Sequence, residues 1–80
     1  MDERFAEYER VRAAERLCVD EYDLLVLRAL ALRGTVVGAA HMLYRDKETR
    51  LKFEFVSRAH ARNVVRSVVE RLAERARVAA

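Results

Sequence analysis

The segment DEYDLLVLRALALRG, which begins at Asp20, limits the possible folds more than any other part of this chain. Asp20 is a residue type that caps helix N-termini, and Gly34 is the residue most often found just past a C-terminus. Asp23 stands where a capping box has an acid. We therefore predict a helix over residues 20–33. After Asp23 it carries only two charges, Arg28 and Arg33. A helix that is apolar on nearly all sides must be covered from more than one direction.

The apolar content of the chain is high for its length. Eighty residues make a single domain, 1–80, in which residues 1–9 form an N-terminal helix or tail. Hydrophobic residues make up 52% of the chain, with no proline and two glycines. Because so short a chain buries only a modest part of its surface, we predict a partner that covers the rest. A homodimer and a paralogous heterodimer both meet this need.

Cysteine and hydropathy exclude several protein classes. Cys18 is the only cysteine, so there is no disulfide framework, and its spacing from His41 and His60 fits no metal site. We predict no cofactor and no metal.

No apolar run approaches the ~18 residues of a membrane span. The start, MDERFAEYER, is too charged for a signal peptide, so we expect a cytoplasmic protein that does not bind membranes. Fourteen arginines and no glutamine are typical of a thermophile.

Residues 35–57 are expected to form a β-hairpin. Leu51, Phe53 and Phe55 alternate with polar residues, as in a half-buried strand. The preceding segment, TVVGAAHMLY, begins with β-branched residues, and the polar DKET between the two is a candidate turn. Residues 10–18 are ambiguous between helix and strand, and the period of two slightly favours a strand.

The last segment, residues 58–78, is predicted to be a second helix. Ser57 is a suitable N-cap, and Ala61, Val65, Val68 and Leu72 recur at helical spacing. The predicted fold is therefore α+β. A small antiparallel sheet, built on the hairpin, packs against the helices over about 20–33 and 58–78, in the order β-α-β-β-α.

Three arginines follow one ridge of that last helix. Arg58, Arg62 and Arg66 are each one turn apart, a spacing at which like charges destabilise a helix slightly. This arginine ridge is either a solvated basic face or a surface completed by RNA phosphates, DNA phosphates or a partner's carboxylates. His60, in the first turn of the same helix, is a candidate phosphate contact.

Nothing in the chain predicts catalysis. His41 would lie opposite Glu54 in the hairpin, but no nucleophile or second acid accompanies the pair. Phosphate-binding loops, nucleophile elbows and dinucleotide fingerprints are missing from the sequence. We predict no catalytic residue and no enzyme.

The order of elements resembles the small dimerising subunit of the archaeal and eukaryotic KEOPS complex, which makes threonylcarbamoyl-adenosine in tRNA. FEFVSRAHARNVVRSVVERL is similar to the family's last strand and helix, with Arg62 and Ser67 matching its motif, and LCVDEYDLLVLRAL is similar to its first strand and helix. The resemblance implies a non-catalytic subunit, or a diverged paralogue, that dimerises, docks on the catalytic subunit and helps to hold tRNA. The arginine ridge and His60 would then face tRNA or an acidic partner. The implied protein interface comprises Leu24, Leu27, Ala31, Val64, Val68 and Val69.

Two other functions remain open. LLVLRALALRGTVVGAAHML resembles the first two helices of winged-helix or helix-turn-helix DNA-binding proteins, which are often dimeric, and VSRAHARNVVRSVVERL resembles a recognition helix. The conformation of residues 35–44 separates these hypotheses, because a strand supports the tRNA-complex subunit and a helix supports the DNA-binding module. The third is a homodimeric structural protein, whose association should not weaken as salt rises.

Overall fold

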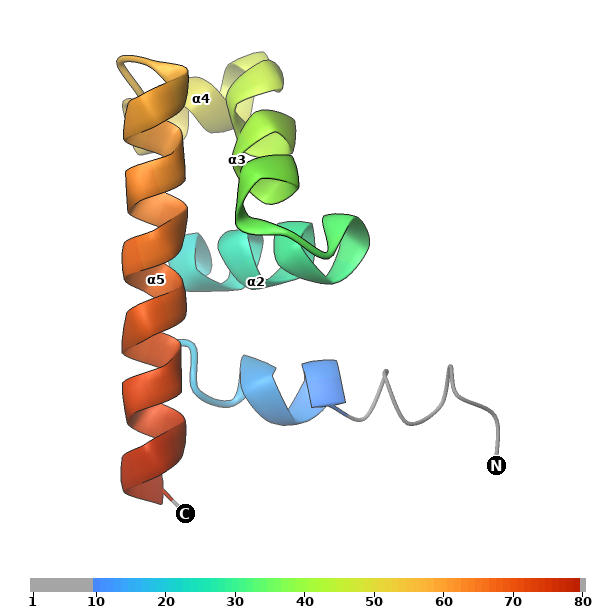
Figure 1. The fold of residues 1–80 in the computed structure, drawn as a ribbon, viewed down its shortest axis with the longest axis vertical. Helices are drawn as coiled ribbons and strands as arrows, with labels where there is room; N and C mark the ends of the chain where they lie inside the picture. Colours follow the sequence, from blue (N-terminus) through green and yellow to red (C-terminus); the bar gives the residue numbers. More distant parts are fainter. Residues whose placement is uncertain (1–9, 80) are drawn as a thin grey trace.

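The computed structural model describes residues 10–79, and every regular element in that range is a helix (Figure 1). Residues 10–15 are helical and lead through a turn into the first labelled helix. The labelled helices are α2 (Glu21–Arg33), α3 (Val36–Arg45), α4 (Lys47–Phe53) and α5 (Arg58–Ala79).

The predicted α+β fold is therefore wrong, since residues 10–79 contain no strand. The expected hairpin over residues 35–57 is replaced by α3 and α4, and the expected strand over 10–18 is a short helix followed by a turn. The predicted helix or tail over 1–9 lies outside the described residues.

Two local caps explain why the supposed hairpin is helical. Thr35 caps α3, its Oγ1 accepting the backbone N–H of Gly38 at 3.0 Å. Asp46 caps α4, its Oδ2 accepting the N–H of Thr49 at 3.1 Å. The DKET segment, which was expected to be a turn, is thus a helix start, because Ser, Thr, Asp and Asn serve in both roles.

The predictions for the two long helices are confirmed. Asp20 caps α2 by accepting the N–H of Asp23 at 2.9 Å, and Gly34 ends it in the left-handed conformation with φ 79°. Ser57 caps α5, its Oγ accepting the N–H of His60 at 3.0 Å. Both helices have boundaries within one residue of those predicted.

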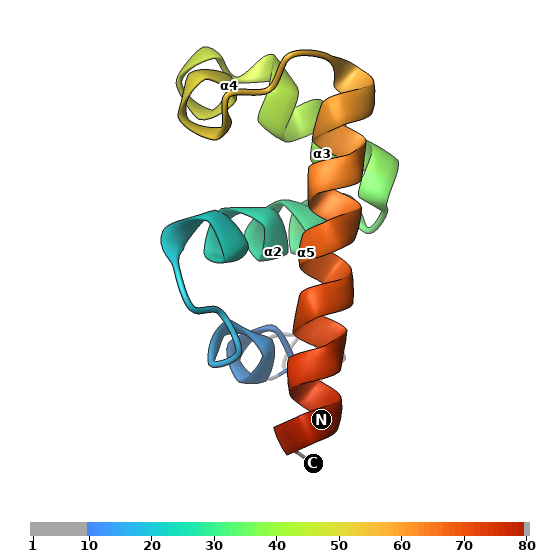
Figure 2. The same ribbon diagram turned by 90° about the vertical axis from the view of Figure 1, so that its left-hand side faces the viewer.

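Helix α5 is the longest helix, and the other helices lie along it (Figures 1 and 2). Its N-terminal half packs against α3, with α4 beside the same end, and α2 crosses near its middle. The helical residues 10–15 lie on the other side of α2 from α3. Segments of this chain therefore flank α2 on two sides, whereas its apolar composition had predicted that one side needs a partner, and Leu32 stays 73% exposed.

The hydrophobic core lies where α2, α3 and α5 meet. Apart from Phe55, its buried members are small or medium in size, which lets the helices approach closely. They are Val26, Ala29, Ala39, Ala40, Leu43, Phe55, Ala61, Val65, Val68 and Leu72.

Within residues 10–79, no single helix is both long enough and apolar enough to cross a membrane. Helices α2 and α3 reach that length and composition only when they are taken together, and the chain bends by 117° between them.

Candidate nucleic-acid interface

A sharp turn joins α2 to α3. Only Gly34 and Thr35 separate the two helices, and the chain bends there by 117°. The Gly34 N–H donates to the Leu30 carbonyl at 2.7 Å, which closes α2, and the Thr35 cap then opens α3. Two helices that meet at such an angle through a short glycine-containing turn resemble a helix-turn-helix unit, whose turn has about three or four residues where this one has two.

Gly38 permits this close approach. A Cβ at position 38 would lie 2.9 Å from Thr35 Oγ1 and 3.0 Å from Arg33 Cβ. Both distances are shorter than normal van der Waals contact, so a side chain here would push α3 away from the end of α2. The glycine expected in a strand is instead a packing requirement of the helix-turn-helix unit.

Helix α3 has one buried and one exposed face. Ala39, Ala40 and Leu43 are buried against α2 and α5. The opposite side carries Val37, His41 and Arg45, spaced four residues apart and all exposed. The second helix of the unit therefore presents a continuous stripe of side chains to its surroundings.

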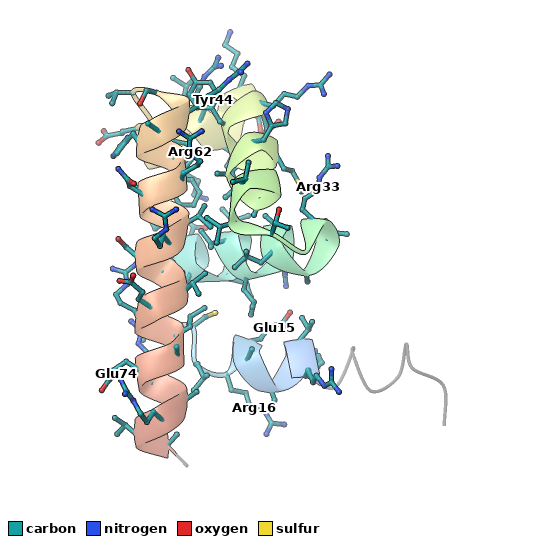
Figure 3. The ribbon with its side chains drawn as sticks, viewed as in Figure 1. Glu15, Arg16, Arg33, Tyr44, Arg62 and Glu74 are labelled. Carbon is teal, nitrogen blue, oxygen red and sulfur yellow. The ribbon has the colours of Figure 1, made fainter. Side chains whose placement is uncertain are left out.

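An open groove separates this stripe from the start of α5. It consists of two adjoining hollows that share His41 and Arg58, the first of about 340 Å³. Arg62 lies on the part of α5 that faces α3 (Figure 3). We call this surface the basic groove, and its lining residues are Val37, Gly38, Ala40, His41, Tyr44, Arg45, Arg50, Arg58 and Arg62.

The arginines of the basic groove are not neutralised within the described part of the chain. Arg45, Arg50, Arg58 and Arg62 have no carboxylate partner among residues 10–79, and Arg50 instead lies 5.3 Å from the centre of the Tyr44 ring. Five cations elsewhere in residues 10–79 form ion pairs with carboxylates, whereas others, such as Arg33 and Arg66, do not. Examples of these pairs are Lys52 with Glu21 at 2.7 Å, Arg75 with Asp23 at 2.8 Å and Arg28 with Glu15 at 3.7 Å. The basic groove thus gathers four arginines without a carboxylate partner among residues 10–79, and such a cluster can attract a polyanion.

The sequence-predicted binding residues divide into two groups. Arg58 and Arg62 line the basic groove, whereas Arg66 is exposed on the next turn of α5 and lines neither hollow. His60 is half-buried and serves the start of α5, since its Nδ1 accepts the Val56 N–H at 3.2 Å and its ring meets Phe55 edge-on at 5.8 Å. Two of the three arginines of the ridge therefore belong to the basic groove, and the third does not.

Sequence reasoning missed His41, Arg45 and Arg50 as members of this surface. The expected hairpin put His41 opposite Glu54, but His41 lies on α3 and Glu54 ends α4. The missed signal was the four-residue spacing of Val37, His41 and Arg45, which marks one face of a helix.

The predicted protein interface is not one exposed surface. Val68 is 1% exposed and belongs to the core. Leu27, Val64 and Val69 are half-buried and pack against the core, and Leu24 is also half-buried. Ala31 alone among the six residues is exposed. Dimerisation stays a prediction, and so does the part that the partly exposed members of this set would have in it.

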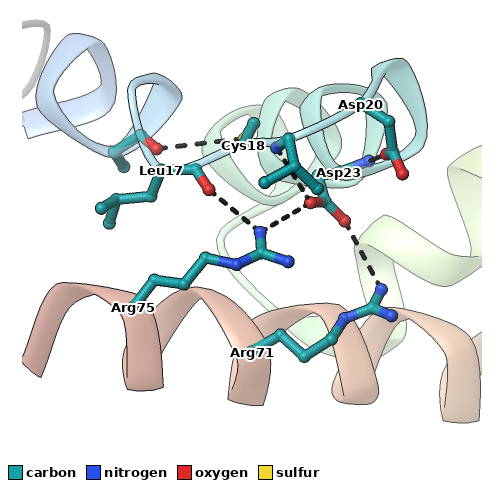
Figure 4. Close-up of polar contacts among 8 residues, drawn as sticks. Leu17, Cys18, Asp20, Asp23, Arg71 and Arg75 are labelled. Atoms are coloured by element: carbon teal, nitrogen blue, oxygen red, sulfur yellow. Dashed lines mark hydrogen bonds and ion pairs between the residues drawn. The ribbon is translucent and has the colours of Figure 1, made fainter. Parts of the chain in front are cut away.

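A buried ion-pair network fixes the opposite half of the molecule (Figure 4). The Asp23 side chain is 2% exposed and accepts hydrogen bonds from Arg75 at 2.8 Å, Arg71 at 3.4 Å and the Val19 N–H at 3.3 Å. Arg75 also donates to the Leu17 carbonyl at 2.9 Å. Burial alone would raise the pKa of Asp23, but the hydrogen bonds from Arg75 and Val19 and the two guanidinium charges hold it below its usual value. This network is structural, because its polar groups satisfy one another.

Two further features of the described residues concern metal binding and thiol chemistry. Residues 10–79 contain no group of three or more His, Cys, Asp or Glu side chains that could hold a metal ion. Cys18 is half-buried, and burial together with the Asp23 carboxylate raises the pKa of its thiol, which disfavours the reactive thiolate.

Comparison of the chain with protein-family models, with curated proteins and with solved structures gave no match. The resemblance to the KEOPS subunit stays a prediction, and the strands on which it depended are not found in residues 10–79.

Proposed function

We propose that this protein is a helix-turn-helix DNA-binding protein that enters the major groove with α3. The main support is the short Gly34–Thr35 turn, which leaves the exposed face of α3 beside arginines that no carboxylate of residues 10–79 neutralises. Residues 36–45 are helical, which was the condition that favoured DNA binding over the tRNA-complex subunit.

The roles of the residues follow from their positions. Val37, His41 and Arg45 form the stripe along α3 and would face base edges, as residues of a recognition helix do. Arg50 and the α5 residues Arg58 and Arg62 flank that stripe and would contact phosphates of one strand. Arginine suits this task because its planar fork can bind a phosphate through two hydrogen bonds.

Duplex DNA fits this surface better than duplex RNA does. The major groove of B-form DNA is wide enough to admit an α-helix. The major groove of A-form RNA is deep and narrow, and side chains cannot read it. A surface whose outermost feature is one side of a helix is therefore suited to DNA. Transfer RNA, the ligand implied by the family resemblance, is the natural competitor to test.

The test is a salt titration of binding to a short fluorescent duplex of random sequence, with tRNA measured in parallel. We expect salt-dependent binding to the duplex that weakens steeply as salt rises to about 200 mM. The Arg58→Gln/Arg62→Gln variant should bind more weakly, and the slope of log affinity against log salt should fall by about two.

The matched control is Arg16→Gln/Arg77→Gln, which removes the same net charge. Arg16 lies remote from α3 (Figure 3), and Arg77 lies in the last turn of α5. It should change the slope much less than the variant in the basic groove. The proposal is wrong if the duplex does not bind at low salt, if tRNA binds more tightly than DNA, or if both double variants lose affinity equally.

A further inference from the structure

One apolar side chain stands within the basic groove. Val37 is 61% exposed and is the second residue of α3. Single exposed apolar residues are common on protein surfaces, so the exposure alone has no meaning. The position is informative, because the N-terminal residues of a recognition helix are those that reach base edges.

The surroundings of Val37 leave room for a nucleic-acid strand to come close. Gly38 and Ala40 line the adjoining hollow and have no side chain beyond Cβ. Arg58 and Arg62 of α5 line the same hollow and could hold a phosphate there. A sugar–phosphate strand seated there would bring the edge of a neighbouring base pair to Val37.

We infer that Val37 reads the C5-methyl group of a thymine, so that the target of this protein contains a required T·A pair. The inference rests on the proposed function. Valine can neither donate nor accept a hydrogen bond, and the C5-methyl of thymine is the one apolar group among the major-groove features that distinguish the base pairs. Cytosine lacks this methyl group, and a purine would set a polar edge against the valine. Val37 is therefore a specificity-determining residue, whereas the arginines supply affinity.

The experiment begins by selecting preferred duplexes from a random pool with the full chain. Each thymine of the selected site is then replaced, one at a time, by deoxyuridine, which removes the methyl group and leaves base pairing unchanged. We expect one position at which the affinity falls roughly fourfold, the value for one apolar carbon transferred to water. Val37→Ala should bind thymine and deoxyuridine at that position almost equally.

Val78→Ala is the matched control, because Val78 is 78% exposed but lies at the far end of α5. It should keep the full preference for thymine. Circular dichroism melting of all three proteins shows whether each variant is folded at the binding temperature.

The outcomes separate the inference from the proposed function. If the protein binds duplex DNA but selects no sequence, or no thymine can be singled out by deoxyuridine, the inference is wrong and the proposed function stands. The same holds if Val37→Ala keeps the discrimination. If no duplex is bound at low salt, the proposed function itself is wrong.

Discussion

Asp23 and Arg75 form an ion pair at 2.8 Å that joins the first turn of α2 to the C-terminal half of α5. The two residues are 52 positions apart, and the carboxylate is 2% exposed. Arg75 uses the same nitrogen to bind the Leu17 carbonyl, so the pair also holds the link before α2 against α5. A buried charge is tolerated here because each oxygen of the carboxylate has a donor.

The first prediction concerns the loss of this carboxylate charge. Asp23→Asn should lower the free energy of unfolding by about 2 kcal/mol, because charge-assisted hydrogen bonds to two guanidinium groups are lost. Arg71 and Arg75 are partly exposed and can turn toward water, which keeps the loss below that of a fully buried pair. Urea denaturation followed by circular dichroism measures the change. Glu74→Gln, at the exposed pair with Arg77, should change stability by less than about 0.5 kcal/mol.

The second prediction concerns acid. Because the folded protein holds the pKa of Asp23 below its ordinary value of 3.8, the folded state binds this proton less readily than the unfolded state does. The contribution of Asp23 is complete above the unfolded pKa and is lost as pH falls through the folded pKa. The stability difference between the native chain and Asp23→Asn should therefore be constant from about pH 5 to 7 and shrink below about pH 4. A difference that is unchanged at low pH would contradict the assignment.

The third prediction tests the turn between α2 and α3. In an open helix position, Gly→Ala stabilises by up to about 1 kcal/mol through helix propensity. Gly38→Ala should instead destabilise by about 1 kcal/mol, because the new methyl group meets Thr35 Oγ1 and Arg33 Cβ. Thermal melting gives the sign. In a Thr35→Ala background the penalty should be smaller, since one of the two close atoms is gone. An increase in melting temperature in the native background would rule out the close approach.

The fourth prediction uses the backbone at the end of α4. Glu54 has φ 58°, the left-handed conformation that costs an ordinary residue about 1–2 kcal/mol. Glu54→Gly should therefore raise the free energy of unfolding by about 0.5–1 kcal/mol. Glu70→Gly, in the interior of α5, should lower it by about 1 kcal/mol. Equal effects of the two substitutions would mean that α4 does not end as described.

The fifth prediction distinguishes the basic groove from the arginine ridge. Arg45 lines the groove and Arg66 does not, although both are exposed arginines on helices. Arg45→Ala should weaken binding to a DNA duplex and relax its sequence preference, whereas Arg66→Ala should have a smaller effect. Binding measured by fluorescence anisotropy at several salt concentrations makes the comparison. A larger effect at Arg66 would favour the original ridge.

The ends of α2 and α5 could be predicted because the signals are local. Asp20, Gly34 and Ser57 act on backbone groups within a few residues of themselves, so their effect does not depend on the rest of the fold. The apolar sides of both helices could also be predicted from the spacing of their hydrophobic residues. The apolar composition of α2 indicated that it would be covered on more than one side.

The segment over 35–57 could not be assigned in the same way. Leu51, Phe53 and Phe55 alternate in the sequence but do not share one face of a strand or helix. Leu51 is 66% exposed, Phe53 is the last residue of α4, and Phe55 is buried after the helix ends. The residues Ala39, Ala40 and Leu43 fit a helix as well as a strand until α2 and α5 are present to bury them.

Some residues of the candidate site could likewise be predicted from the sequence, and others could not. Arg58 and Arg62 could be found from the sequence, because four-residue spacing on one helix makes them neighbours whatever surrounds them. Their grouping with His41, Arg45 and Arg50 required the folded chain, since packing of α3 against α5 brings together residues from three helices. Caps and spacing are short-range properties of the backbone, whereas a surface shared by several elements exists only after the core has brought them into contact.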